Sequence, residues 1–229
     1  NKFLMKLLIR QADVVIAHTK ESYPLLTERK KEKSTMYFFH PFFTDQMLIK
    51  EGLPDSTVKA YDLLIWGNVR RSKGIEQFME YLLKKNKIDD YRIKIVGRFE
   101  SEEYYKAFKD RYTGSFVSIE NKFIEHSELD VLHYKSHAVF FPYTGTSVLN
   151  SGALILSLPK GIPIIGPCEG AFKEMGDRGF IYVYKTFDDV LTLINEKKST
   201  TPNYQHSFAT FLQEHTWNKF ADRLYAELQ

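Results

Sequence analysis

The chain has 229 residues, 43% of them hydrophobic and 15% aromatic, a composition that excludes an intrinsically disordered protein. Its formal net charge is only +3 and its lysines and arginines form no clear basic face, which argues against a nucleic-acid-binding protein. The single cysteine, Cys168, excludes an internal disulfide and suits a reducing compartment. Since no apolar run approaches the roughly twenty residues that cross a bilayer, and no signal peptide is present, we expect a cytoplasmic protein.

The first part of the chain looks like the middle of a longer protein, because it begins with Asn1 rather than methionine. The pattern predicts the end of a helix over residues 2–10 and a buried strand over 12–17. A helix over 21–33, interrupted near Pro24, and a short strand over 36–39 follow. These two strands cannot bury both faces alone, so we interpret residues 1–46 as the tail of an N-terminal domain and 47–60 as a link.

From residue 61 the pattern becomes regular, with strands that are apolar on both faces alternating with amphipathic helices. Strands are predicted at 61–66, 91–96, 116–119, 138–141, 162–165 and 180–183, and helices at 75–85, 102–111, 127–135, 151–158, 171–175 and 187–195. This alternation predicts an α/β fold with a doubly wound parallel sheet, a Rossmann-like domain over 61–200. Helices over 204–214 and 217–228, the second capped by Thr216, complete a C-terminal segment, 201–229.

The first strand-to-helix turn of this domain, WGNVRRSKGIEQF, carries a cluster of cations. Gly67 lets the chain leave the strand sharply, and Gly74 lets the next helix pack closely. Arg70, Arg71 and Lys73 lie between them, where guanidinium and ammonium groups suit a diphosphate. The alternative is a solvated loop before an ordinary helix.

Two further turns place small residues at the same predicted sheet edge. Gly97 follows the second strand directly, where a side chain would obstruct a ligand. Asn150, Ser151 and Gly152 lie where a helix is expected to begin. The Ser151 hydroxyl either caps that helix or, with the N–H groups of Ser151 and Gly152, donates to a phosphate oxygen, and the two roles are compatible.

Two carboxylates, Glu169 and Glu174, flank the short helix that follows the fifth strand. They either accept hydrogen bonds from sugar hydroxyls or are surface acids. The seven histidines show no zinc-ligand spacing, and the chain has neither a GxGxxG fingerprint nor a P-loop, so we expect no metal or other cofactor.

The order of these turns resembles that of a known family. WGNVRRSKG, IVGRF, FIEHSELDVLHYKSHAVFFPY and KGIPIIG occur in the same succession in the C-terminal donor-binding domain of GT-B glycosyltransferases, in particular those of family 4. The resemblance covers roughly residues 61–195. ADVVIAHTKES and MYFFHPFF are similar to the end of the family's N-terminal domain. The loop PYTGTSVLNSGAL resembles that of members that build polysaccharides.

The resemblance implies roles for several residues. The family's phosphate-binding lysine and arginine fall on Lys73 and Arg70, which are the catalytic candidates. By the same resemblance, the loop amides that hold the diphosphate fall on Ser151 and Gly152, the acid near the sugar falls on Glu174 or Glu169, and the edge beside the base falls on Phe123 and Ile124. Together with the turn residues described above, the donor-binding candidates are Gly67, Gly97, Phe123, Ile124, Asn150, Ser151, Gly152, Glu169 and Glu174. The sequence departs from the family at its pair of glutamates, whose positions are taken by the apolar Val148 and Leu156.

The implied activity is transfer of a sugar from a nucleotide-diphosphate donor, a UDP- or GDP-sugar, with retention of configuration and without a metal. The acceptor, a glycan or a lipid-linked molecule, would be held by the N-terminal domain, and a lipid-linked one would bring the parent protein to the inner face of a membrane. We expect this chain alone to bind donor weakly and to transfer nothing measurable. The other interpretations are a non-catalytic nucleotide-sugar-binding or assembly module and a sugar-nucleotide epimerase of like architecture.

Overall fold

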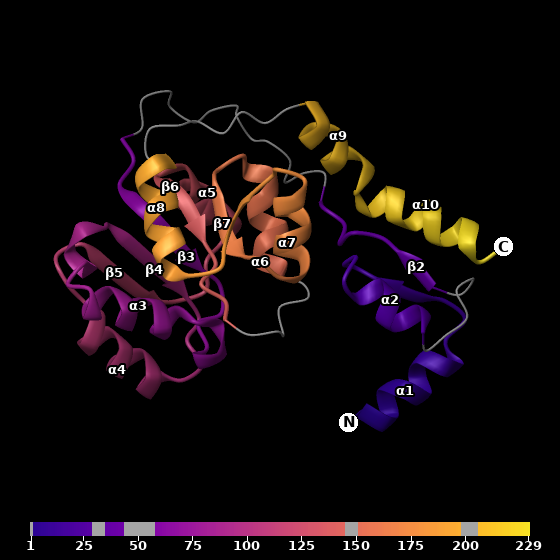
Figure 1. The fold of residues 1–229 in the computed structure, drawn as a ribbon, viewed down its shortest axis with the longest axis horizontal. Helices are drawn as coiled ribbons and strands as arrows, with labels where there is room; N and C mark the ends of the chain where they lie inside the picture. Colours follow the sequence, from indigo (N-terminus) through magenta and orange to yellow (C-terminus); the bar gives the residue numbers. More distant parts are fainter. Residues whose placement is uncertain (1, 29–34, 44–57, 145–150, 198–205) are drawn as a thin grey trace.

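The computed structural model describes residues 2–28, 35–43, 58–144, 151–197 and 206–229. Its described part holds one small and one large sheet. The small sheet pairs β1 (Val15–Ala17) with β2 (Thr35–Tyr37) in parallel, next to the helices α1 (Lys2–Gln11) and α2 (Ser22–Thr27). These elements form an N-terminal unit beside the main domain (Figure 1).

The large sheet has six strands in the order β5-β4-β3-β6-β7-β8, and each pair of neighbours is parallel. Its strands are β3 (Tyr61–Trp66), β4 (Ile93–Gly97), β5 (Val117–Asn121), β6 (Ser136–Phe140), β7 (Ile164–Pro167) and β8 (Tyr182–Tyr184). The chain order reverses direction between β3 and β6, which is the Rossmann arrangement. The predicted doubly wound parallel sheet is therefore confirmed.

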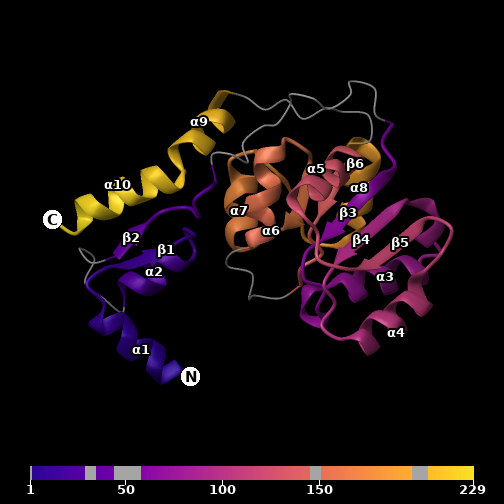
Figure 2. The same cartoon turned by 180° about the vertical axis from the view of Figure 1, so that it is seen from behind.

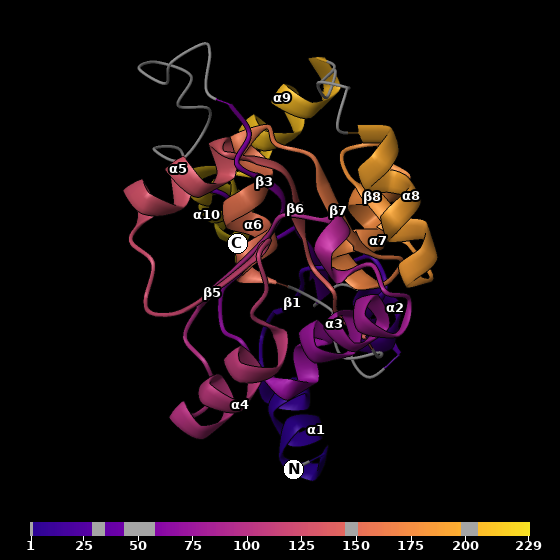
Figure 3. The same cartoon turned by 90° about the vertical axis from the view of Figure 1, so that its left-hand side faces the viewer.

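Helices cover both faces of this sheet, because its central strands are buried on both faces. They are α3 (Ile75–Lys84), α4 (Glu102–Tyr112), α5 (His126–Tyr134), α6 (Gly152–Ser157), α7 (Gly170–Asp177) and α8 (Phe187–Lys197), with 3-10 turns η3 (Arg71–Lys73), η4 (Ile88–Asp90) and η5 (Leu158–Lys160). Leu63 and Ile65 of β3 pack in the cluster that includes α3, α4 and α8, whereas Leu64 packs in the cluster with α5, α6 and α7. Figure 2 shows the α5–α7 side, and Figure 3 shows α5 and α8 on opposite sides of the sheet.

The last helices, α9 (His206–Glu214) and α10 (Trp217–Glu227), connect the main domain to the N-terminal unit (Figure 1). Phe211 on α9 packs edge-on against Phe39, and Phe220 on α10 against Phe38. The backbone N–H of Phe42 also donates to the carbonyl of His215 at 2.7 Å. Since both ends of the chain contribute to this contact, it holds the N-terminal unit against the C-terminal helices.

Two predicted details of the flanks have different outcomes. The Thr216 cap is confirmed, because its hydroxyl accepts the N–H of Lys219 at 3.3 Å. The predicted interruption near Pro24 is wrong: Pro24 lies inside α2, in its first turn, where a missing N–H costs no helical hydrogen bond. The link expected over 47–60 falls almost wholly outside the described residues, and the domain boundaries remain predictions.

Candidate functional site

A cleft of about 380 Å³ opens at the carboxyl ends of the central strands. It lies at the switch point of the sheet, where α/β proteins commonly bind ligands. The predicted site residues that line it are Gly67, Arg70, Lys73, Gly97, Phe123, Ile124, Ser151 and Gly152. Asn150, and Val148 in the same loop, lie outside the described residues. The structure thus brings together loops that follow β3, β4 and β5 with the start of α6.

The loops on one side of the cleft are tied to one another beyond the ends of their strands. The N–H of Val69 donates to the carbonyl of Arg98 at 2.8 Å, and the N–H of Lys122 donates to the carbonyl of Gly97 at 3.1 Å. Gly97 has a φ of +152°, and a Cβ atom built on it would lie 1.7 Å from the carbonyl oxygen of Gly67. Glycine is therefore required at position 97 by the close approach of two backbone segments, independently of any ligand.

Lys73 lies in the turn η3, half-buried at the cleft wall. Its Nζ atom lies 4.0 Å from the centroid of the Tyr143 ring, an arrangement in which the ring face attracts the cation. Burial, and secondarily the neighbouring charge of Arg70, lower the pKa of Lys73 below its ordinary value. Burial and the charge of Arg70 therefore make the protonated form of Lys73 less favourable, and a bound anion would relieve this cost.

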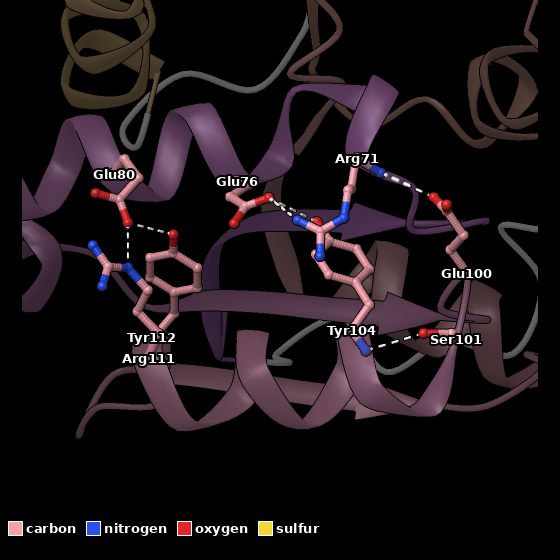
Figure 4. Close-up of polar contacts among 8 residues, drawn as sticks. All are labelled: Arg71, Glu76, Glu80, Glu100, Ser101, Tyr104, Arg111 and Tyr112. Carbon is pink, nitrogen blue, oxygen red and sulfur yellow. Dashed lines mark hydrogen bonds and ion pairs between the residues drawn. The ribbon is translucent and has the colours of Figure 1, made fainter.

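Arg71, the remaining cation of the turn, is not among the residues that line this cleft, and its side chain points toward Glu76 and Tyr104 (Figure 4). Its Nη1 atom lies 3.4 Å from Oε2 of Glu76, and its guanidinium lies 4.3 Å from the centroid of the Tyr104 ring. Its backbone N–H donates to Glu100 at 3.3 Å. Arg71 therefore anchors the turn against α3 and α4, which leaves Arg70 and Lys73 as the cations of this turn that line the cleft.

Ser151 caps the short helix α6, which confirms the first of the two roles expected for it. Its Oγ atom accepts the N–H of Leu154 at 3.3 Å and lies 3.4 Å from the hydroxyl oxygen of Tyr143. Gly152 next to it is exposed, and a Cβ atom built there would meet nothing within 4 Å. The second role of Ser151 and Gly152, donation to a phosphate, remains a prediction.

The opposite end of the cleft, beyond β5, is aromatic and exposed. Phe123 is 61% exposed, and the guanidinium of Arg98 lies 5.2 Å from the centroid of its ring. Lys122 beside it is paired with Glu120 at 2.7 Å and Glu128 at 2.5 Å. A flat exposed ring at the rim of a cleft offers a stacking surface for a planar group.

A chain of polar groups, formed by the partly buried Trp66 and the buried Ser157 and His133, lies beside the cleft. The indole N–H of Trp66 donates to Oγ of Ser157 at 3.0 Å, and Nε2 of His133 lies 2.9 Å from the same oxygen. Burial, followed by the charge of Lys160, lowers the pKa of His133 to about 3. His133 is therefore neutral in the folded protein at physiological pH, and it shares the Ser157 hydroxyl with the indole N–H of Trp66.

This histidine should make stability depend on pH. Between pH 3 and about 6.5, the ordinary pKa of histidine, the unfolded chain binds a proton at His133 that the folded chain does not, so stability falls as pH falls. In His133→Gln we expect the slope of unfolding free energy against pH to be flatter by up to about 1.4 kcal/mol per pH unit. Urea titrations between pH 4 and 7 measure this. His126→Gln, at an exposed position, is the control and should keep the slope of the unsubstituted protein. If the plot of unfolding free energy against pH for His133→Gln ran parallel to that of the unsubstituted protein, the pH dependence would not come from His133.

Neither of the two candidate acids lines this cleft, and their surroundings differ. Glu169 lines a neighbouring cavity of about 420 Å³, which shares Tyr143 with the first. Glu174 is buried, 6% exposed, and its carboxylate accepts the hydroxyl of Tyr37 and, at 3.1 Å, the N–H of Lys20. Glu174 therefore joins α7 to the N-terminal unit. Nearby, Glu21 accepts the N–H of Gly170 at 2.9 Å.

We expect Glu174→Ala to lower the free energy of unfolding by about 2 to 4 kcal/mol, because it leaves the Tyr37 hydroxyl and the Lys20 N–H without their acceptor. Nucleotide affinity should be retained by the folded variant, since Glu174 does not line the cleft. Urea unfolding measures the first effect, with the exposed Glu196→Ala as control. Unchanged stability combined with lost nucleotide-sugar affinity would instead assign Glu174 to ligand binding.

Several residues of the cleft were not singled out from the sequence as candidates: Trp66, Asn68, Arg98, Lys122, Tyr143 and Ala153. Arg98, Lys122 and Tyr143 follow strands at the same edge as Gly67, so the argument applied to the first turn would have found them. Ala153 carries no such signal. Leu156, noted as a departure from the family pattern, also lines the cleft.

Neither a metal cluster nor a membrane span is found in the described ranges. No group of three or more His, Cys, Asp or Glu residues there is arranged to hold a metal ion. No helix there combines the length and the apolar character needed to span a membrane.

No protein-family model and no curated protein matches the chain. Its fold is similar to that of solved glycosyltransferases. HepE from Anabaena, in complex with UDP-glucose, has a TM-score of 0.74 at 13% identity over 99% of this chain and 66% of that chain. The lipopolysaccharide outer core galactosyltransferase WaaB has a TM-score of 0.62 at 14% identity, over 95% of this chain and 62% of that chain. TarM has a TM-score of 0.65 at 12% identity, over 99% of this chain and 45% of that chain.

The chain thus spans less than two thirds of the length of each of these proteins. At such identities the likeness shows a shared fold, which confirms the expected GT-B architecture. Membership of family 4 remains a prediction.

Proposed function

We propose that this chain is the donor-binding part of a glycosyltransferase that moves a sugar from a nucleoside-diphosphate donor to a glycan or lipid-linked acceptor. The observation that carries the proposal is the cleft at the switch point of the sheet, where Arg70 and Lys73 face the capped start of α6 at Ser151. The fold shared with HepE, whose structure holds UDP-glucose, supports it.

The chemistry follows from the charges. A nucleotide sugar carries a diphosphate, and its leaving group gains negative charge as the bond to the sugar breaks. Two cations fixed beside that group stabilise the transition state more than the ground state, and so they lower the barrier. Lys73 is suited to this role, because burial and the charge of Arg70 disfavour its protonated form, and a bound diphosphate would compensate for both. Protein cations supply this stabilisation in our proposal, without a metal and with retention of configuration.

The sugar and the acceptor lie toward the N-terminal unit in this proposal. Glu169 lines the cavity adjacent to the cleft and is the acid placed to accept hydrogen bonds from sugar hydroxyls. The acceptor is held mainly by residues outside this chain, and a lipid-linked acceptor would place the whole protein at the inner face of a membrane.

The direct test is thermal unfolding of this chain with millimolar UDP, GDP, CDP, ADP and dTDP and their sugars. A ligand that binds only the folded state stabilises it by RT ln(1 + [L]/Kd), about 2.7 kcal/mol at a hundredfold excess over Kd. We expect one diphosphate to raise the midpoint. The absence of any shift at millimolar ligand would contradict the proposal.

A second candidate is a nucleotide-sugar-binding module that transfers nothing. Leu156 favours it, because this apolar side chain lines the cleft where the family resemblance implies a glutamate. Assays of the longest available form of the protein with nucleotide sugar and glycan acceptors separate the two: binding without transfer or hydrolysis supports the module.

A further inference from the structure

The residues that line the cleft change along the edge of the sheet, from aromatic and apolar at one end to cationic and polar at the other. Phe123 and Ile124 follow β5 at one end, Gly97 follows β4, Gly67 follows β3, and Lys73 and Ser151 lie at the other end. These strands are adjacent in the order β5-β4-β3-β6, so the cleft extends over three strand spacings, about 14 Å.

If the proposed function holds, this grading sets the direction of the ligand. The diphosphate belongs at the cationic end and the planar base at the aromatic end. The ribose connects the two, and it therefore lies in the middle. There it faces the glycines of the sheet edge on one side and Ala153 and Leu156 of α6 on the other.

The middle of the cleft offers the ribose little that accepts a hydrogen bond. Ala153 and Leu156 have no polar side-chain atoms, and no Asp or Glu occurs among the described residues that line the cleft. Trp66 offers only a donor there, and its indole N–H is taken by Ser157, whereas the nearby backbone carbonyl of Gly97 already accepts the N–H of Lys122.

Nucleotide sites that recognise the 2′-hydroxyl group usually do so through a carboxylate that accepts its proton. A protein discriminates strongly against the analogue without the hydroxyl when that loss leaves a buried polar group unpaired. Among the described residues that line this cleft, no buried carboxylate is present at the ribose to be left unpaired. Asn68 and Arg98, the polar side chains at the rim, are exposed and are solvated by water in either case.

We propose that this cleft does not recognise the ribose 2′-hydroxyl group, and that it binds a 2′-deoxynucleoside diphosphate as tightly as the matching ribonucleoside diphosphate. The donor class is thereby widened to include sugars carried on deoxynucleoside diphosphates. The inference rests on the proposed function and deepens it.

The test titrates the chain with matched pairs of ligands: UDP and dUDP, GDP and dGDP, ADP and dADP, and CDP and dCDP. Chemical-shift changes in NMR spectra give each dissociation constant even when binding is weak. For the base that binds, we expect the two constants to agree within about threefold. A ribonucleotide preference of tenfold or more would overturn this inference and leave the proposed function standing. The absence of binding by all eight ligands would overturn both.

A gain-of-function variant tests the placement of the ribose. Leu156→Glu puts a carboxylate on the wall that we assign to the ribose, and it should create a preference of about tenfold or more for the ribonucleotide. Val131→Glu adds the same charge at an exposed position of α5 and should create none. Circular dichroism establishes that both variants are folded. Equal ribo and deoxy affinities in folded Leu156→Glu would refute the placement of the ribose at this wall.

Discussion

Gly97→Ala is expected to lower the free energy of unfolding by more than about 4 kcal/mol, enough to unfold much of a domain of ordinary stability. The new Cβ atom would lie 1.7 Å from the carbonyl oxygen of Gly67, and both atoms belong to backbone segments that the sheet holds in place. The φ of +152° adds strain that alanine does not tolerate. Urea unfolding, or the soluble yield where the variant does not fold, measures the effect.

Glycines at the same edge provide graded controls. Gly67→Ala should be milder, because its φ of +107° is unfavourable but its nearest new contact is Ala153 at 3.8 Å. Gly152→Ala should change stability by less than about 0.5 kcal/mol, since its Cβ would enter open space at the start of α6. A Gly97→Ala variant as stable as Gly152→Ala would show that the strands separate more at this edge than the structure indicates.

Lys73→Ala is expected to weaken binding of the nucleoside diphosphate by about 10- to 100-fold, the effect of losing one charge-assisted hydrogen bond. If the whole protein is a transferase, its kcat should fall by about 10²- to 10³-fold, because the lost cation acts most strongly on the leaving diphosphate. Titration of the chain with the diphosphate that stabilises it measures the first effect, and single-turnover transfer by the longest available form measures the second.

The control for this variant is Lys106→Ala, which removes the same charge from the exposed face of α4 and should leave binding unchanged. Arg71→Ala is a second comparison. It removes a cation from the same turn whose guanidinium is engaged by Glu76 and Tyr104, so we expect lost stability but little lost affinity. Equal losses of affinity in Lys73→Ala and Lys106→Ala would mean that only the overall charge of the domain matters.

Arg70 and Lys73 are neighbours, and their effects should not add. Arg70 lowers the pKa of Lys73, so its removal makes the remaining lysine easier to protonate. The double variant Arg70→Ala/Lys73→Ala should therefore differ from the sum of the single variants. Such coupling is expected of two cations that share one diphosphate.

The sequence by itself determined the fold of the main domain and the edge at which the cleft opens. Apolar runs that alternate with amphipathic helices encode a parallel sheet, and residues that directly follow such strands meet at one edge. Gly67, Lys73, Gly97 and Ser151 could be placed there for this reason. The cap at Thr216 was also readable, because a cap depends on residues within one helical turn.

Only the tertiary structure decided which neighbours each side chain has. Arg71 is directed to α4 whereas Lys73 faces Tyr143, although the two are two positions apart in one turn. Glu174 is bound by Tyr37, a residue 137 positions earlier in the chain. Gly97 is required by Gly67 rather than by a ligand. Local patterns fix backbone conformation and burial, but contacts between distant segments depend on how whole elements pack, and a single sequence does not display that packing.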